Sequence, residues 1–92
     1  LGDLMTLLKL RRGRYALVEE KVPPGAKAIG RQLKELGLPD QCVIAAIIRH
    51  GQITLPRGGT TLEEGDEVLA VTDSDGALEL AKLLEPPSRE NL

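Results

Sequence analysis

The side chains best suited to binding chemistry stand at the end of one apolar run, residues 43–48. Arg49 and His50 follow this run directly, so a cation and an imidazole would lie together at the rim of a strand. A guanidinium binds two oxygens of a phosphate at once, which makes Arg49 a candidate for holding a phosphorylated ligand. The alternative is an ion pair with a carboxylate of a neighbouring turn, such as Asp66, because an unpaired buried charge is costly.

The sequence shows no catalytic or metal-binding constellation around these residues. His50 is the only histidine and Cys42 the only cysteine, so we expect neither a zinc cluster nor a disulfide within these 92 residues. His50 is expected to be an exposed turn residue, with a ligand contact as the alternative, and Cys42 a small buried apolar residue. Asp66 is expected to accept backbone N–H groups within its own turn. The pattern therefore gives no support for an enzyme.

Hydrophobic patterning predicts the strands that would position Arg49. The β-branched run 43–48 is typical of a strand covered on both faces, and His50-Gly51-Gln52 predicts a tight hairpin turn. Three further strands are predicted, over residues 14–22, 52–55 and 67–72. The adjacent acidic pairs Glu19-Glu20 and Glu63-Glu64 are expected to face solvent.

Apolar residues at helical spacing predict three helices, over residues 1–10, 26–36 and 76–84. Gly37 would end the second helix, and Asp73-Ser74-Asp75 would offer N-cap oxygens for the third. The first helix is apolar around much of its girth, so we expect it to pack against a neighbouring domain or a second subunit. Together these elements predict an α+β fold, a small four-stranded, mostly antiparallel sheet or half-open barrel capped by helices.

Composition limits the classes of partner. The chain has 12 basic and 14 acidic residues, interspersed along the sequence, and Tyr15 is its only aromatic residue. This balance argues against a nucleic-acid module and against a basic membrane-surface patch. A chain of 92 residues is near the lower end for an independent core, so a homodimer is plausible on physical grounds. Because it begins at Leu1 rather than Met, we expect it to be a fragment of a longer protein.

Several short motifs occur together, in order, over residues 22–73. A loop of small residues and a segment ending in L-x-L-P precede an apolar strand ending in I-x-R-x-G; a proline and an L-x-x-G-D turn then precede a valine-rich strand. The residues in these motifs are Gly30, Leu33, Leu36, Leu38, Pro39, Ile47, Ile48, Arg49, His50, Gly51, Pro56, Thr61, Leu62, Gly65, Asp66, Val68 and Val71. In this order and spacing the sequence resembles the TrkA-C domain, the C-terminal subdomain of regulator of potassium conductance (RCK) proteins.

The resemblance implies a regulatory domain rather than an enzyme. Residues 1–12 would be a connecting helix from a preceding domain, residues 13–85 the regulatory domain, and residues 86–92 a frayed tail. Such domains are cytoplasmic and dimerise. They usually follow a Rossmann-type domain, and they belong to membrane-embedded potassium channels, transporters or antiporters. The dinucleotide fingerprint G-x-G-x-x-G is absent here, so we expect no NAD or ATP cofactor in this fragment.

In part of the family the regulatory ligand is cyclic di-AMP, bound between two copies. The resemblance carries the ligand-binding positions onto Ile47, Ile48, Arg49, His50 and Pro56. These residues are therefore the candidate ligand site, with no catalytic or metal-binding residue assigned. The alternative function is a purely structural dimerisation module that has no ligand of its own.

Overall fold

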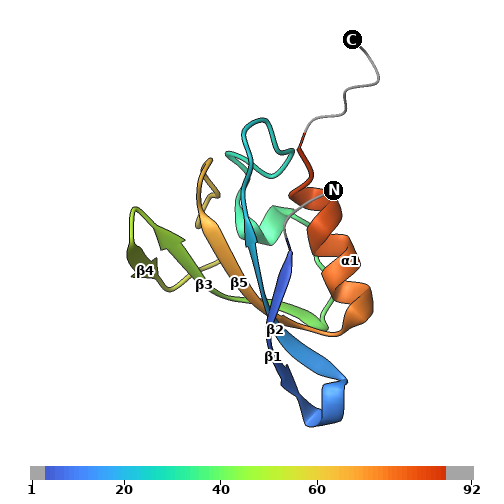
Figure 1. Cartoon of the computed structure of the whole chain (residues 1–92). Coiled ribbons are helices and arrows are strands. Elements are labelled where there is room, and N and C mark those ends of the chain that lie inside the picture. Colours follow the sequence, from blue (N-terminus) through green and yellow to red (C-terminus); the bar gives the residue numbers. More distant parts are fainter. Residues whose placement is uncertain (1–3, 87–92) are drawn as a thin grey trace.

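The computed structural model describes residues 4–86, and its centre is one antiparallel five-stranded sheet. The strands are β1 (Met5–Leu10), β2 (Tyr15–Lys21), β3 (Cys42–Arg49), β4 (Gln52–Thr54) and β5 (Glu67–Thr72), in the spatial order β1-β2-β5-β3-β4 (Figure 1). A helix, α1 (Ser74–Leu83), lies across one face of the sheet. The α+β class is confirmed, with five strands in place of the predicted four.

The extra strand replaces the helix predicted over residues 1–10. Residues 5–10 form β1, which pairs antiparallel with β2 and places Met5 opposite Glu19 and Leu10 opposite Tyr15. The connecting helix predicted over residues 1–12 is therefore wrong for this part, and Leu1–Asp3 lie outside the described residues. A short apolar run fits a strand as well as a helix, and here β2 provides a hydrogen-bonding partner.

The helix predicted over residues 26–36 is also wrong. The chain there makes successive tight turns, with one short 3-10 turn, η2 (Leu33–Glu35). Gly30 has a φ of 80° and donates its N–H to the Leu62 carbonyl at 2.8 Å. The Leu62 N–H donates in turn to the Arg31 carbonyl at 3.3 Å. Pairing with a distant segment thus prevails over local helical spacing.

The last helix follows the sequence prediction closely, because α1 spans residues 74–83 and the predicted helix spanned residues 76–84. Asp73 caps α1, because its side chain accepts the Gly76 N–H at 2.8 Å. Gly65, before β5, has a φ of 86°, a left-handed conformation that glycine adopts without strain. No helix within residues 4–86 is long and apolar enough to cross a membrane. The predicted frayed tail lies, apart from Pro86, outside the described residues.

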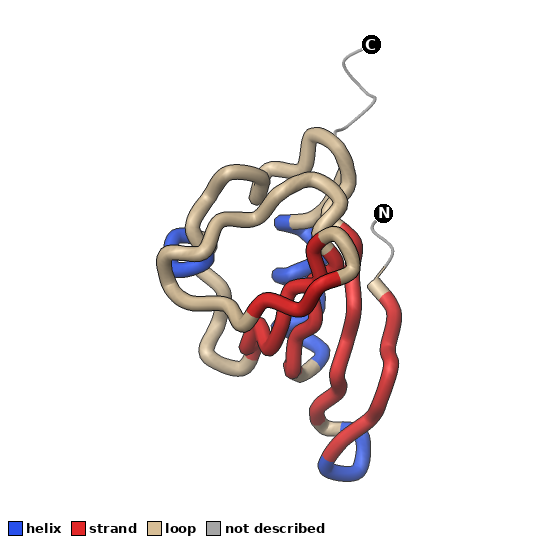
Figure 2. The backbone as a smooth tube through the Cα atoms, turned by 90° about the vertical axis from the view of Figure 1, so that its left-hand side faces the viewer, coloured by secondary structure: helices blue, strands red, loops and turns tan. Residues whose placement is uncertain are grey.

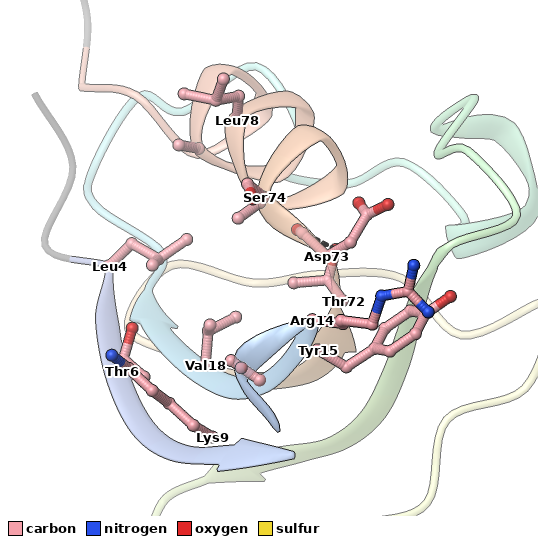
Figure 3. Close-up of a pocket in the computed structure, with 14 residues that line it drawn as sticks. Leu4, Thr6, Lys9, Arg14, Tyr15, Val18, Thr72, Asp73, Ser74 and Leu78 are labelled. Atoms are coloured by element: carbon pink, nitrogen blue, oxygen red, sulfur yellow. Dashed lines mark hydrogen bonds between the residues drawn. The ribbon is translucent and has the colours of Figure 1, made fainter. Parts of the chain in front are cut away.

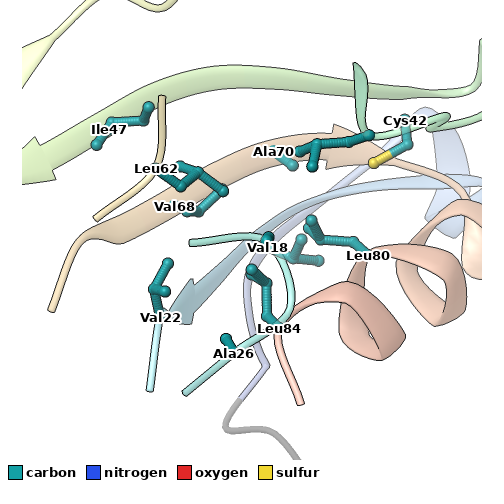
Figure 4. Packing of buried hydrophobic residues seen from close by; sticks show 12 residues of the cluster. Val18, Val22, Ala26, Cys42, Ile47, Leu62, Val68, Ala70, Leu80 and Leu84 are labelled. Carbon is teal, nitrogen blue, oxygen red and sulfur yellow. The ribbon is translucent and has the colours of Figure 1, made fainter. Parts of the chain in front are cut away.

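The core lies between the sheet and α1, closed at one end by the loops that Figure 2 shows beside the sheet. Its fully buried members come from the strands, the loops and the helix, and include Val18, Val22, Ile47, Leu62, Val68, Leu80 and Leu84 (Figure 4). Cys42 is also buried, as predicted, and burial raises the pKa of its thiol. Glu20 shares the face of Val18 and is 1% exposed, so the prediction that it faces solvent is wrong.

The sheet face opposite α1 is rich in exposed apolar side chains. Leu17, Val71 and Val43 are aligned across β2, β5 and β3, and Val43 is 58% exposed. We call this the open face; it comprises Met5, Leu8, Leu17, Val43, Ile53 and Val71. The prediction that residues 43–48 are covered on both faces is therefore wrong for the single chain.

Candidate ligand site and the arginine ion-pair cluster

Arg49, at the end of β3, is the centre of a hydrogen-bonded cluster. Its guanidinium binds both carboxylate oxygens of Asp66, with Nε–Oδ1 and Nη2–Oδ2 distances of 2.8 Å. It also forms an ion pair with Glu63 at 2.9 Å and donates to the Thr61 carbonyl at 2.9 Å. The ion-pair alternative for Arg49 is the one that the structure shows.

The turn before β5 holds the Asp66 carboxylate in position to bind Arg49. The Asp66 side chain accepts the Glu63 N–H at 2.9 Å, as predicted, and is 1% exposed. Burial by itself would raise the pKa of the Asp66 carboxyl. Hydrogen bonds from Arg49 and Glu63, together with the positive charge of Arg49, outweigh burial and hold that pKa below its usual value. Asp66 is therefore a charged anchor for Arg49.

The hairpin that follows Arg49 is a two-residue turn. Arg49 pairs with Gln52 across it, and His50 and Gly51 have φ values of 51° and 75°. Two successive left-handed residues are typical of a type I′ turn, which matches the twist of a β-hairpin. His50 is exposed, in agreement with its prediction as a turn residue.

The structure does not bring the five candidate residues into one site. Ile47 is 0% exposed and points into the core. Ile48, Arg49 and His50 line a small hollow of about 250 Å³, together with acidic residues of the neighbouring turn and β5. Pro56 lines a different hollow, together with residues at the start of β3.

The hollow at Pro56 has a volume of about 460 Å³ and lies between η2, the start of β3 and the loop after β4. Two backbone hydrogen bonds fasten η2 to this loop, from Lys34 N–H to the Gly58 carbonyl at 3.1 Å and from Leu33 N–H to the Thr60 carbonyl at 2.9 Å. The Lys34 stem lies next to Gly58: a Cβ added to Gly58 would be 3.6 Å from Lys34 Cβ, an ordinary van der Waals contact.

The charges of this hollow suit an anionic ligand. Lys34 and Arg57 both line it, with Asp40 as the acidic lining residue, and neither cation forms an ion pair within residues 4–86. Val43, on the open face, also lines it. Sequence reasoning missed Lys34, Arg57 and Val43. The available signal was that two family motifs, L-x-L-P and the proline after the hairpin, flank these residues.

Comparison with known protein families assigns the chain to one of them. The sequence model of the TrkA-C domain matches residues 17–85. The chain belongs to the TrkA-C domain family. This confirms the resemblance drawn from residues 22–73.

Relatives of the TrkA-C domain described here are longer proteins. The chain is 39% identical over 75 residues to a Trk system potassium uptake protein TrkA homologue from Archaeoglobus fulgidus, which covers 82% of this chain and 17% of that protein. It is 34% identical over 86 residues to TrkA of Mycobacterium tuberculosis, covering 94% of this chain and 39% of that protein. The chain therefore spans less than half the length of either relative.

Solved structures share the fold. The GsuK channel has a TM-score of 0.76 at 21% identity, covering 97% of this chain and 16% of that chain. The RCK_C domain dimer of S. agalactiae BusR, in complex with c-di-AMP, has a TM-score of 0.67 at 25% identity. That likeness covers 78% of this chain and 93% of the BusR domain.

Proposed function

We propose that this TrkA-C domain is a cytoplasmic regulatory domain of a potassium channel, transporter or cation antiporter, which dimerises and senses a small ligand. Its family membership and the potassium uptake proteins among its relatives support this. A neighbouring Rossmann-type domain and a membrane-embedded subunit would belong to the rest of such a system. The domain itself would act by changing the relative orientation of the parts attached to it.

The ligand that we propose is cyclic di-AMP, bound between two copies at the hollow lined by Lys34 and Pro56. A cyclic dinucleotide presents two phosphates and two flat bases. Lys34 and Arg57 suit the phosphates, while Pro56 and Val43 offer apolar contact for a base. Because Val43 also belongs to the open face, the hollow is continuous with the surface on which a second copy would pack. The c-di-AMP complex of the similarly folded BusR domain supports this choice.

Arg49 has an indirect role in this proposal. Its contacts with Asp66, Glu63 and Thr61 occupy the guanidinium, so a phosphate would have to displace carboxylates. Arg49 instead fixes the hairpin that leads to Pro56. Direct binding at Ile48, Arg49 and His50 remains the alternative site, and the experiment separates the two.

The test measures the melting temperature of the domain with and without cyclic di-AMP. A ligand at about 100 times its dissociation constant raises the free energy of unfolding by about 2.7 kcal/mol. This corresponds to a rise of several degrees in the melting temperature of a small domain. We expect Lys34→Ala combined with Arg57→Ala to abolish the shift, and Lys27→Ala combined with Lys82→Ala, which removes two exposed cations elsewhere, to leave it intact. If Arg49→Ala abolishes the shift and the Lys34/Arg57 variant does not, the ligand binds at the hairpin.

A structural dimerisation module is the second candidate function, and the open face favours it because exposed apolar surfaces mark interaction sites. Under this candidate the chain dimerises, but cyclic di-AMP, adenine nucleotides and divalent cations all leave the melting temperature unchanged. Sedimentation of the same samples gives the dimer content. A dimer without any ligand-dependent shift would contradict the sensing proposal and support the structural one.

A further inference from the structure

A second concave surface lies away from the hollow at Pro56. It is a groove of about 520 Å³ between the β1–β2 hairpin and α1, shown in Figure 3. Most of its lining is apolar, and the residues that form its floor and walls are Leu4, Ala16, Val18, Ala77, Leu78 and Ala81. Three of these are alanines, whose short side chains leave space between the helix and the hairpin. Leu78 stands at the mouth of the groove and is 61% exposed.

The end of the groove nearest the hairpin tip is basic. Arg14 lies there beside Tyr15 (Figure 3), and Arg11, Arg12 and Arg14 together line the adjoining surface of the tip. Lys9 also lines the groove from β1. None of these four cations forms an ion pair within the described part of the chain.

Basic and acidic residues are unevenly distributed along the chain, contrary to the prediction that they are interspersed. Residues 4–18 contain four basic residues and no acidic one, whereas residues 19–86 contain seven basic and twelve acidic residues. The fold then places the basic segment at one end of the molecule, where the hairpin projects from the sheet (Figure 1). Asp73 lines the groove as well, but its carboxylate accepts the Gly76 N–H at the start of α1.

We infer that this groove binds a single-chain anionic amphiphile of the alkyl phosphate or fatty acid class. The aliphatic chain lies between Val18 and the alanines of α1, and the anionic head is held by Arg14 with the neighbouring tip arginines. Apolar ligand sites with a few polar groups at one end have volumes of about 300–1,000 Å³, so the groove has room for one chain. Because the surface is concave and enclosed by two elements, a free amphiphile fits it better than the flat surface of a bilayer.

The experiment is an amide NMR titration of the whole 92-residue chain with dodecyl phosphate below its critical micelle concentration. We expect saturable shifts concentrated in β1, β2 and α1. Leu78→Glu places a negative charge beside the aliphatic chain of the anionic ligand, and Arg14→Ala removes the contact to its head group. Each variant should raise the dissociation constant at least tenfold. For Arg14 the reason is that a hydrogen bond to a charged group is worth about a factor of ten or more.

Matched controls separate this site from general adhesion. Leu55→Glu and Lys27→Ala change an exposed leucine and an exposed cation elsewhere, and they should leave the dissociation constant unchanged. Inorganic phosphate and the neutral dodecyl maltoside should each bind at least tenfold more weakly than dodecyl phosphate. Equal binding of either one would overturn the inference, because the head or the chain would then suffice without the other.

Two further outcomes would also overturn it. If vesicles containing phosphatidylglycerol bind the chain but monomeric dodecyl phosphate shifts no groove amide, the basic tip contacts a bilayer surface instead. If the groove amides respond only to protein concentration, a second copy covers the groove. The amide spectrum of each variant shows directly whether it is folded, so loss of binding is not confused with unfolding.

Discussion

At the scale of single residues, the ion pair between Arg49 and Asp66 joins the β3–β4 hairpin to the turn before β5. The folded-state pKa of Asp66 is lowered, so its contribution to stability is complete above the ordinary aspartate pKa of about 3.9. That contribution is lost as the pH falls below this value through the lowered folded-state pKa. Asp66→Asn should therefore lower the unfolding free energy near pH 7 by about 2–3 kcal/mol and flatten its dependence on acid pH.

Urea unfolding between pH 2 and pH 7 measures both effects. Glu64→Gln is the matched control, because Glu64 lies in the same turn, is exposed and forms no hydrogen bond or ion pair in the described structure. It should change neither the free energy nor its pH profile noticeably. An Asp66→Asn variant with the acid profile of the unmodified domain would show that the pair is not responsible for acid sensitivity.

The sequence predicted the surroundings of some residues correctly and of others wrongly. Arg49 and Asp66 were predictable as an ion pair, because both flank strands that pattern reasoning found correctly. Glu20 was misplaced because it was grouped with Glu19, although strand alternation puts it on the side of Val18 and Val22. Lys34 was placed in a helix that does not form, since its position depends on a backbone hydrogen bond to Gly58, a residue distant in sequence.

At the scale of elements, the start of α1 packs tightly against the sheet through Gly76. A Cβ added to Gly76 would lie 2.1 Å from Thr72 Oγ1 and 2.9 Å from Cys42 Cβ, both part of the core edge. Alanine favours a helix over glycine by about 1 kcal/mol, but here the clash should dominate. We expect Gly76→Ala to destabilise the domain by about 1–3 kcal/mol, as measured by thermal or urea unfolding.

Gly59→Ala is the matched control for this substitution. A Cβ there meets no atom within 4 Å, so its effect on stability should be neutral or slightly favourable. If Gly76→Ala is as stable as the unmodified domain, α1 can shift away from β3 and β5 without loss, and the tight contact is not required for folding.

The two wrong helix predictions have different physical origins. Residues 5–10 form a short apolar run whose periodicity fits either a helix or a strand, and only the position of β2 decides between them. Residues 26–36 do carry apolar residues at helical spacing, but Gly30 takes a left-handed conformation and pairs with Leu62. In contrast, the cap and the apolar stripe of α1 agree with each other, and the sequence sufficed to predict this helix.

At the scale of the whole molecule, the open face predicts association. Its residue Val43 is 58% exposed in the single chain, and a charge placed in a buried apolar interface without a partner is costly. We expect Val43→Glu to raise the dimer dissociation constant at least tenfold, as measured by sedimentation at several concentrations. Leu78→Glu, an equivalent change on α1 at the other side of the sheet, should leave it unchanged.

If the Val43→Glu variant sediments as the unmodified domain does, the dimer interface does not lie on the open face. The sequence predicted that a homodimer is plausible, because a chain of 92 residues is near the lower end for an independent core. It did not locate the dimer interface, since the run 43–48 looked buried on both sides. The hollow at Pro56 could not be predicted for a related reason, because its lining comes from three segments that meet only in the folded chain.

The strand order also has a consequence for synthesis on the ribosome. β5 lies at the centre of the sheet, between β2 and β3, yet it is the last strand to be made. Until residue 72 has left the exit tunnel, the nascent chain can form only two separate hairpins, β1–β2 and β3–β4, which do not pair with each other. The apolar sides of both hairpins stay exposed until β5 pairs with β2 and β3. Most contacts of the sheet therefore form late and over long sequence separations. When the residues before Glu67 have emerged from the ribosome and β5 has not, the unfinished domain therefore exposes the apolar sides of two hairpins, and emergence of β5 lets the whole sheet close.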